Sequence, residues 1–172
     1  MQASEFSSKV LGDPTRRLAM DWRDLNGTWY FESDEYQGEI KVPFAWSSRA
    51  SGVNLPWLER AVYSRRIEIP IDWDQVVMIC FSRVHYSCVI SLNGTQIGEH
   101  EGGYSQFAIM VPNDLLTEER LDLKVEVFAP RDNRYIPHGK QRTIPRSDFD
   151  GVCFTPTSGI WGDVWLEHRS ST

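Results

Sequence analysis

The sequence contains few cysteines, no long apolar run and no excess of positive charge. No apolar run approaches the length needed to cross a bilayer, which argues against a membrane-spanning protein. The formal net charge of −6 over 172 residues argues against nucleic acid and anionic membranes as main partners. A hydrophobic content of 41% and a charged content of 24% are typical of globular proteins. The length suits one domain with a single core and room for a ligand cleft.

The three cysteines are odd in number and too sparse for a disulfide framework. We interpret Cys80, Cys88 and Cys153 as small buried hydrophobic residues, although the spacing of Cys80 and Cys88 leaves open one bridge across a hairpin. Residues 1–21 lack the apolar core of a signal peptide, so we expect a cytoplasmic protein.

Helical periodicity is also missing. No apolar pattern keeps the helical period for three turns, and residues 113–119 have room for one helical turn at most. Short alternating or continuous apolar runs take its place, at residues 29–31, 39–42, 61–69, 76–81, 86–92, 95–97, 121–127 and 161–166. The Asn93-Gly94 pair predicts a tight hairpin between two of them. Many short strands without intervening helices predict an all-β fold, and a jelly-roll β-sandwich suits this number of strands.

The domain boundaries follow from the same pattern. Residues 1–24 are predicted to be a flexible lead-in, residues 25–169 one jelly-roll domain, and residues 170–172 a short tail.

The sequence offers no catalytic constellation. The four histidines and the cysteines show no metal-binding spacing, and no nucleophile elbow G-x-S-x-G occurs. Gly139-Lys140 lacks the remaining residues of a phosphate-binding loop. Asp148 and Asp150 could lie as close as the two carboxyl groups of a glycosidase, but a polar loop beside Gly151 is the favoured interpretation. We therefore predict no catalytic residue, no metal site and no cofactor in this chain.

Binding is better supported than catalysis. Sugar sites combine aromatic rings with planar polar side chains, because sugars present apolar faces and a rim of hydroxyl groups. Two long loops of the predicted sandwich hold such residues, and long structureless loops are often functional. The candidates are Trp46, Arg49 and Asn54 in the first loop, and Lys140, Gln141, Asp148 and Asp150 in the second. A solvated loop, or a surface that packs on another domain, remains the alternative interpretation.

Four motifs occur in a fixed order along the chain: VPFAWSSRASGV (42–53), SLNGTQIGEHEGGYSQF (91–107), HGKQ (138–141) and TPTSGIWGDVWLE (155–167). Together they resemble the N-terminal sugar-binding domain of glycoside hydrolase family 2, which includes β-galactosidases, β-glucuronidases and β-mannosidases. The resemblance runs from about Leu25 to Glu167, nearly the whole chain.

The resemblance implies a jelly-roll domain of the galactose-binding-domain-like kind. In the family it is followed by an immunoglobulin-like domain and a (β/α)₈ barrel. The barrel carries both catalytic glutamates of a retaining mechanism, and it does not fit into 172 residues. The implied partners are a β-glycoside, the two further domains and, since this domain often contributes to oligomer contacts, a second copy of the protein. In several members an aspartate six residues before the glycine of the last turn reaches the sugar. Cys153 occupies that position here, so Asp148 or Asp150 would have to take its role.

Two other functions stay open at this point. The chain could be a free-standing carbohydrate-binding module or lectin, with a concave site lined by aromatic rings. It could also be a structural interaction domain without a sugar ligand, in which the aromatic rings of Trp46, Trp57 and Trp161 are exposed anchors for a protein partner.

Overall fold

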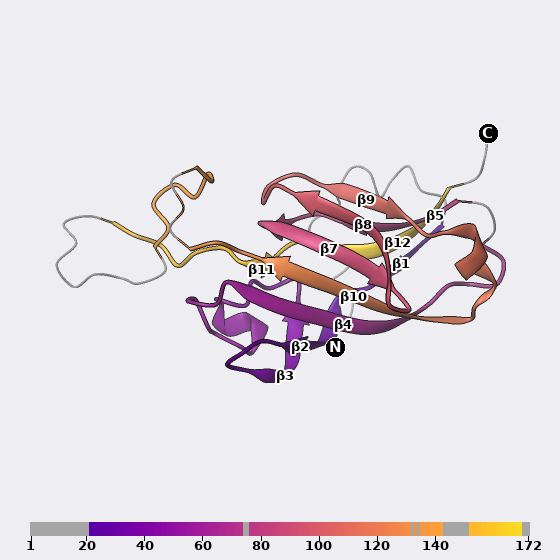
Figure 1. The fold of residues 1–172 in the computed structure, drawn as a ribbon, viewed down its shortest axis with the longest axis horizontal. Coiled ribbons are helices and arrows are strands. Elements are labelled where there is room, and N and C mark those ends of the chain that lie inside the picture. The colour runs from indigo at the N-terminus through magenta and orange to yellow at the C-terminus, as the bar shows by residue number, and fades with distance from the viewer. Residues whose placement is uncertain (1–20, 74–75, 132, 134, 143–151, 170–172) are drawn as a thin grey trace, which may run out of the picture.

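Residues 21–73, 76–131, 133, 135–142 and 152–169 are described by a computed structural model, in which they form a two-layered β-sandwich (Figure 1). Sheet A has the strand order β1-β12-β5-β9, and sheet B has the order β3-β2-β4-β10-β7-β8. The prediction of an all-β sandwich is confirmed. In the described part of the chain, no helix is long and apolar enough to span a membrane.

The strand boundaries follow the apolar runs of the sequence closely. Sheet A consists of β1 (Asp21–Asp24), β5 (Val76–Phe81), β9 (Phe107–Met110) and β12 (Val164–Arg169). Sheet B consists of β2 (Gly27–Glu32), β3 (Gln37–Val42), β4 (Arg60–Glu68), β7 (Ser87–Leu92), β8 (Thr95–Glu101) and β10 (Arg120–Phe128). A small third sheet pairs β6 (Val84–His85) with β11 (Gly159–Ile160), and two single turns of 3-10 helix are η2 (Arg49–Ser51) and η3 (Asn113–Thr117).

The core lies between the two sheets and is built by alternation. In β10, Leu121, Leu123, Val125 and Val127 are buried while the residues between them point to solvent, because successive side chains of a strand lie on opposite faces. The hairpin of β7 and β8 turns at Asn93 and Gly94, which both have positive φ (49° and 82°), as a two-residue hairpin loop requires.

An aromatic cluster closes the core at one end of the sandwich. Phe31, Trp46 and Tyr63 are fully buried, with ring centroids 5.1 Å apart for Phe31 and Tyr63 and 6.3 Å apart for the stacked pair of Trp46 and Tyr63. Trp46 belongs to the loop between β3 and β4, so this loop contributes to the core as well as to the surface.

Two sequence-based expectations need correction. Asp21–Asp24, assigned to the flexible lead-in, form the edge strand β1, which pairs with β12 in the register Asp21 to His168. β1 has no alternating apolar pattern because all four of its residues are exposed. The bridge left open between Cys80 and Cys88 does not exist, since β5 and β7 belong to different sheets and neither residue forms a disulfide.

The loops of interest gather at one end of the sandwich (Figure 1), and Trp46 of the aromatic cluster belongs to one of them. We call residues 43–59 and the described residues of 129–158 the end loops. They are joined by hydrogen bonds from Trp46 N to the oxygen of Ser158 (3.3 Å), from Ser47 Oγ to the oxygen of Pro156, and from Ala129 N to the oxygen of Glu59 (2.7 Å). β12 runs from this end to the opposite one, where Arg169 pairs with Val76.

Candidate functional site

The first end loop presents Arg49 and Asn54 to solvent. Ser48 caps the η2 turn, because its side chain accepts a hydrogen bond from Ala50 N (3.2 Å), and Gly52 ends the turn in the left-handed conformation. Arg49 is exposed at the start of this turn, and Asn54 is exposed at φ 58°, a backbone conformation that asparagine tolerates better than most residues. Both side chains are therefore held on short, capped backbone and are available to a ligand or a partner.

The second end loop presents Lys140, whereas Gln141 is partly engaged within the fold. Gln141 N donates to the oxygen of His138 (3.1 Å), and its side-chain oxygen accepts a hydrogen bond from Thr157 N. Phe154 N donates to the oxygen of Lys140 (3.1 Å), which holds the two arms of the loop together. Lys140 is exposed and Gln141 is half-buried.

Trp46 does not have the exposed position that the sequence suggested. Its ring is fully buried between Phe31 and Tyr63, so it cannot stack on a ligand. The physical reason is that the loop folds back over the open end of the sandwich, where a large apolar ring is needed to seal the core. Asp148 and Asp150 lie outside the described residues.

Other aromatic side chains are exposed at this end. Trp57 is 41% exposed, and its indole nitrogen donates to Glu35 Oε2 (2.6 Å). Phe154 is 60% exposed and Tyr135 is 96% exposed. Trp161 is half-buried, since its nitrogen donates to the oxygen of Gly103 (2.9 Å). Trp57 is therefore exposed, as the interaction-domain interpretation expects. Phe154 and Tyr135 are also exposed aromatic side chains, and their irregular sequence context did not identify them.

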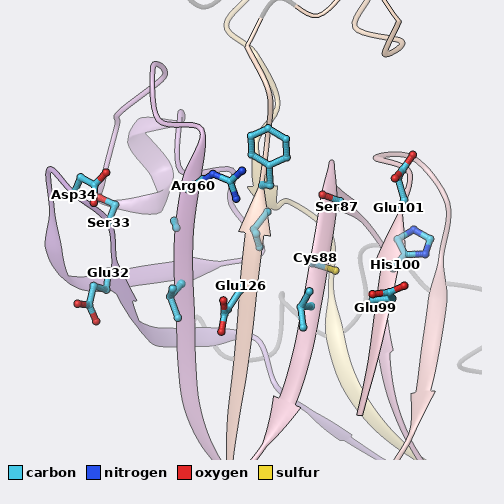
Figure 2. A pocket seen from close by; sticks show the side chains of 15 residues that line it. Glu32, Ser33, Asp34, Arg60, Ser87, Cys88, Glu99, His100, Glu101 and Glu126 are labelled. Atoms are coloured by element: carbon cyan, nitrogen blue, oxygen red, sulfur yellow. The ribbon is translucent and has the colours of Figure 1, made fainter. Parts of the chain in front are cut away.

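A second candidate site is a groove of about 840 Å³ over the outer face of sheet B (Figure 2). Its floor follows the cross-strand register, in which Arg60 of β4 faces Phe128 of β10, and Phe128 faces Ser87 of β7. Ser87 in turn faces Glu101 of β8. The next row of the floor consists of Val62, Glu126, Val89 and Glu99.

The groove is strongly acidic. Five carboxylates line it, from Glu32, Asp34, Glu99, Glu101 and Glu126. The guanidinium of Arg60 lies 4.1 Å from the ring centre of Phe128, and Lys124 Nζ lies 2.7 Å from Glu126 Oε1 beside the groove. The Tyr86 hydroxyl donates to Glu101 Oε1 (3.3 Å), and desolvation together with this carboxylate raises the pKa of Tyr86. The alternation at 121–127 predicts that Glu126 points outward, but no local pattern shows that these residues share one groove.

Within the described ranges, no group of three or more histidine, cysteine, aspartate or glutamate side chains could hold a metal ion. The groove and the end loops offer hydrogen-bonding groups, aromatic rings and charged side chains to a ligand.

No family model matches the chain. Its sequence is 27% identical over 160 residues to a β-galactosidase of Thermoanaerobacterium thermosulfurigenes, an alignment that covers 84% of this chain and 22% of that protein. The chain thus spans about a fifth of the length of the curated relatives that it matches.

Solved structures share the fold. A β-glucuronidase from an uncultured Clostridium sp. matches with a TM-score of 0.64 at 23% identity, over 87% of this chain and 29% of that one. A GH2 β-galacturonidase from Eisenbergiella tayi, bound to glycerol, matches with a TM-score of 0.63 at 18% identity, over 88% of this chain and 25% of that one.

Proposed function

We propose that this chain is the sugar-binding and domain-docking module of a glycoside hydrolase family 2 enzyme. The premise is that the chain is homologous to one domain of the β-galactosidases and β-glucuronidases of that family. In this proposal the chain contributes loops to the substrate site of a catalytic domain elsewhere in the protein. Its partners are a β-glycoside and the further domains of the enzyme.

One observation carries the proposal. Two loops that are distant in the sequence meet at one end of the sandwich and expose polar side chains that the core does not use. Arg49, Asn54 and Lys140 supply hydrogen-bond donors and charge there, and Trp57 and Phe154 supply exposed rings. This mixture suits a surface that contacts a sugar and a neighbouring domain together.

The test uses the full-length family 2 enzyme that, in this proposal, contains this chain. The changes are Arg49→Ala, Lys140→Ala and Asn54→Gly, where glycine is chosen because it accepts the positive φ of residue 54. In the isolated chain each change should alter the free energy of unfolding by no more than about 0.5 kcal/mol, as for other exposed sites. In the enzyme, kcat/KM for an aryl β-glycoside should fall by about threefold or more, a loss of roughly 0.7 kcal/mol of transition-state stabilisation.

Arg66→Ala is the matched control, because Arg66 is exposed in the middle of sheet B and pairs with Asp122 (3.0 Å). It should leave the kinetics unchanged. If the end-loop variants unfold the isolated chain by several kcal/mol and keep normal kinetics, these residues are scaffold and the proposal is wrong.

The groove on sheet B supports a second candidate function, the binding of an oligosaccharide by the chain alone. Its carboxylates and serines can accept or donate hydrogen bonds to sugar hydroxyls, and the ring of Phe128 and the aliphatic side chains of Val62 and Val89 supply apolar contact. The excess of carboxylates disfavours uronic acids, because like charges repel at short range.

Calorimetric titration of the isolated chain distinguishes this candidate from the first. A neutral β-linked tetrasaccharide should bind with Kd of about 10⁻³ to 10⁻⁵ M, which corresponds to roughly 4–7 kcal/mol, and a uronic-acid oligosaccharide should bind more weakly. Glu99→Gln should weaken binding several-fold, whereas Glu119→Gln, outside the groove, should not. An absence of saturable binding to either sugar would remove this candidate and leave the docking role untouched.

A further inference from the structure

A narrow cavity of about 20 Å³ lies beneath the end loops and outside the groove on sheet B. His85 of β6 lines it from the sandwich, Arg131 and His138 line it from the second end loop, and Ser158 lines it from the segment before β11. The cavity therefore lies where the end loop rests on the body of the domain.

Polar atoms around this cavity are buried without a hydrogen-bond partner. They are Nδ1 of His85, Nδ1 of His138 and Oγ of Ser158. His85 is only 5% exposed and Ser158 only 3%. His85 is also tightly enclosed, since a Cβ atom on Gly103 would stand 2.2 Å from its Nδ1. Burying a neutral imidazole here costs much less free energy than burying an imidazolium, because an unpaired charge is far more costly to bury than an unpaired dipole.

Among the described residues that line the cavity, no side chain offers a counter-charge to a protonated imidazole. Arg131 carries the only full charge among the described residues that line the cavity, and it is positive. Its guanidinium pairs with Glu59 (Nε to Oε1, 3.5 Å), so that carboxylate already has a cationic partner. The other titratable groups that face His85 are the Tyr86 and Tyr104 rings, at 5.6 and 5.9 Å between centroids.

The electrostatics of His85 agree with this geometry. Burial and then the neighbouring His138 lower the pKa of His85, so the docked state holds this imidazole neutral at neutral pH. When the loop is released, water can solvate the ring and it binds a proton more readily. The docked arrangement is therefore fully stable above the ordinary histidine pKa of about 6.5 and loses stability as the pH falls below it.

We propose that His85 and His138 form a pH-sensitive seat for the second end loop, which stays docked on the sandwich while the buried His85 imidazole is neutral and is released when His85 is protonated. The released segment is residues 136–142, which is otherwise held by hydrogen bonds such as that from the Tyr104 hydroxyl to the oxygen of Pro137 (3.1 Å). The consequence for a substrate site rests on the proposed function, because this segment carries Lys140. The seat itself is testable without any enzyme.

Hydrogen exchange followed by NMR on the 172-residue chain tests the seat. Rates are measured between about pH 5 and pH 8 and divided by the intrinsic rate at each pH. The reporter amides are those of Gln141 and Arg142, which donate to the oxygens of His138 (3.1 Å) and Phe154 (2.9 Å). Their protection should fall by up to about tenfold per pH unit below the transition for one proton taken up. The amide of Val111, which donates to the oxygen of Val77 (2.8 Å) in sheet A, should keep its protection.

His138→Gln removes the neighbouring imidazole that helps to lower the pKa of His85 and keeps a polar side chain, so the pH dependence of the reporter amides should be reduced. His168→Gln is the matched control, because His168 stacks on Trp73 away from the end loops and this change should preserve the pH dependence. Constant protection of the reporters in the unmodified chain would overturn the proposal. So would an unchanged pH dependence in His138→Gln, or imidazole signals of His85 that titrate at or above the ordinary histidine pKa.

Discussion

At the scale of single residues, Gly159 shows how closely the loop end is packed. Its φ of 75° is left-handed, and a Cβ atom there would stand 2.1 Å from the Tyr63 hydroxyl and 2.5 Å from the Trp46 ring. The same hydroxyl accepts a hydrogen bond from Ile160 N (3.2 Å), and burial raises the pKa of Tyr63, so it stays protonated. Glycine is required here by both the backbone conformation and the lack of space.

We predict that Gly159→Ala destabilises the chain by about 2–5 kcal/mol, the sum of left-handed strain and overpacking. Gly139→Ala is the matched control, because Gly139 also has positive φ (57°) but no atom lies within 4 Å of its added Cβ. Only the strain of about 1–2 kcal/mol applies there. Urea unfolding of both variants measures the difference, and equal losses would show that crowding at Tyr63 and Trp46 is not the cause.

At the scale of elements, the hairpin of β7 and β8 and the second end loop differ in what holds them. The turn of the hairpin is fixed by local chemistry, because Asn93 and Gly94 adopt the positive φ values (49° and 82°) that a two-residue hairpin loop requires. The end loop is fixed mainly by contacts to segments far away in the chain, such as Tyr104 to Pro137 and Gln141 to Thr157. The hairpin should therefore be insensitive to pH in the range where the proposed histidine seat responds, because asparagine does not titrate.

At the scale of the whole molecule, the two sheets enclose one core, and strand β12 ends on the side of the sandwich opposite the end loops. β12 carries the backbone away from the end loops, so a domain that directly followed Arg169 would begin at the opposite end of the sandwich. Contact between the end loops and a catalytic domain would then require that domain to lie alongside or beyond the sandwich. The shared core also predicts how the cysteine side chains behave.

Cys80 in sheet A and Cys88 in sheet B are buried at 1% and 3% exposure, and burial raises the pKa of Cys88 to about 12. Cys153 is only half-buried. We predict that a thiol reagent at neutral pH labels Cys153 first, and that Cys80 and Cys88 react at least about 10³-fold more slowly, because they require unfolding of the sandwich. Mass spectrometry of partly labelled chain, with and without urea, measures the order. Labelling of Cys88 as fast as Cys153 would show that sheet B opens without global unfolding.

The sequence by itself determined the class of fold and most of its strands. Alternation at 121–127, the continuous apolar run at 76–81 and the Asn93-Gly94 turn are local signals, and the structure confirms each of them. They are readable because a strand side chain faces the core or the solvent with a period of two, whatever its partners are. β1 was missed because an exposed edge strand has no such pattern.

Tertiary structure alone decided what surrounds each side chain. Trp46 lies in an irregular loop, and nothing local distinguishes a ring that seals the core from one that faces a ligand. The groove unites Arg60, Ser87 and Glu101 only through the register of strands that are far apart in the chain, and His85 meets His138 only because the end loop folds back onto β6. Burial, crowding and shared charge depend on these long-range contacts, and the periodicity of a single segment carries no information about them.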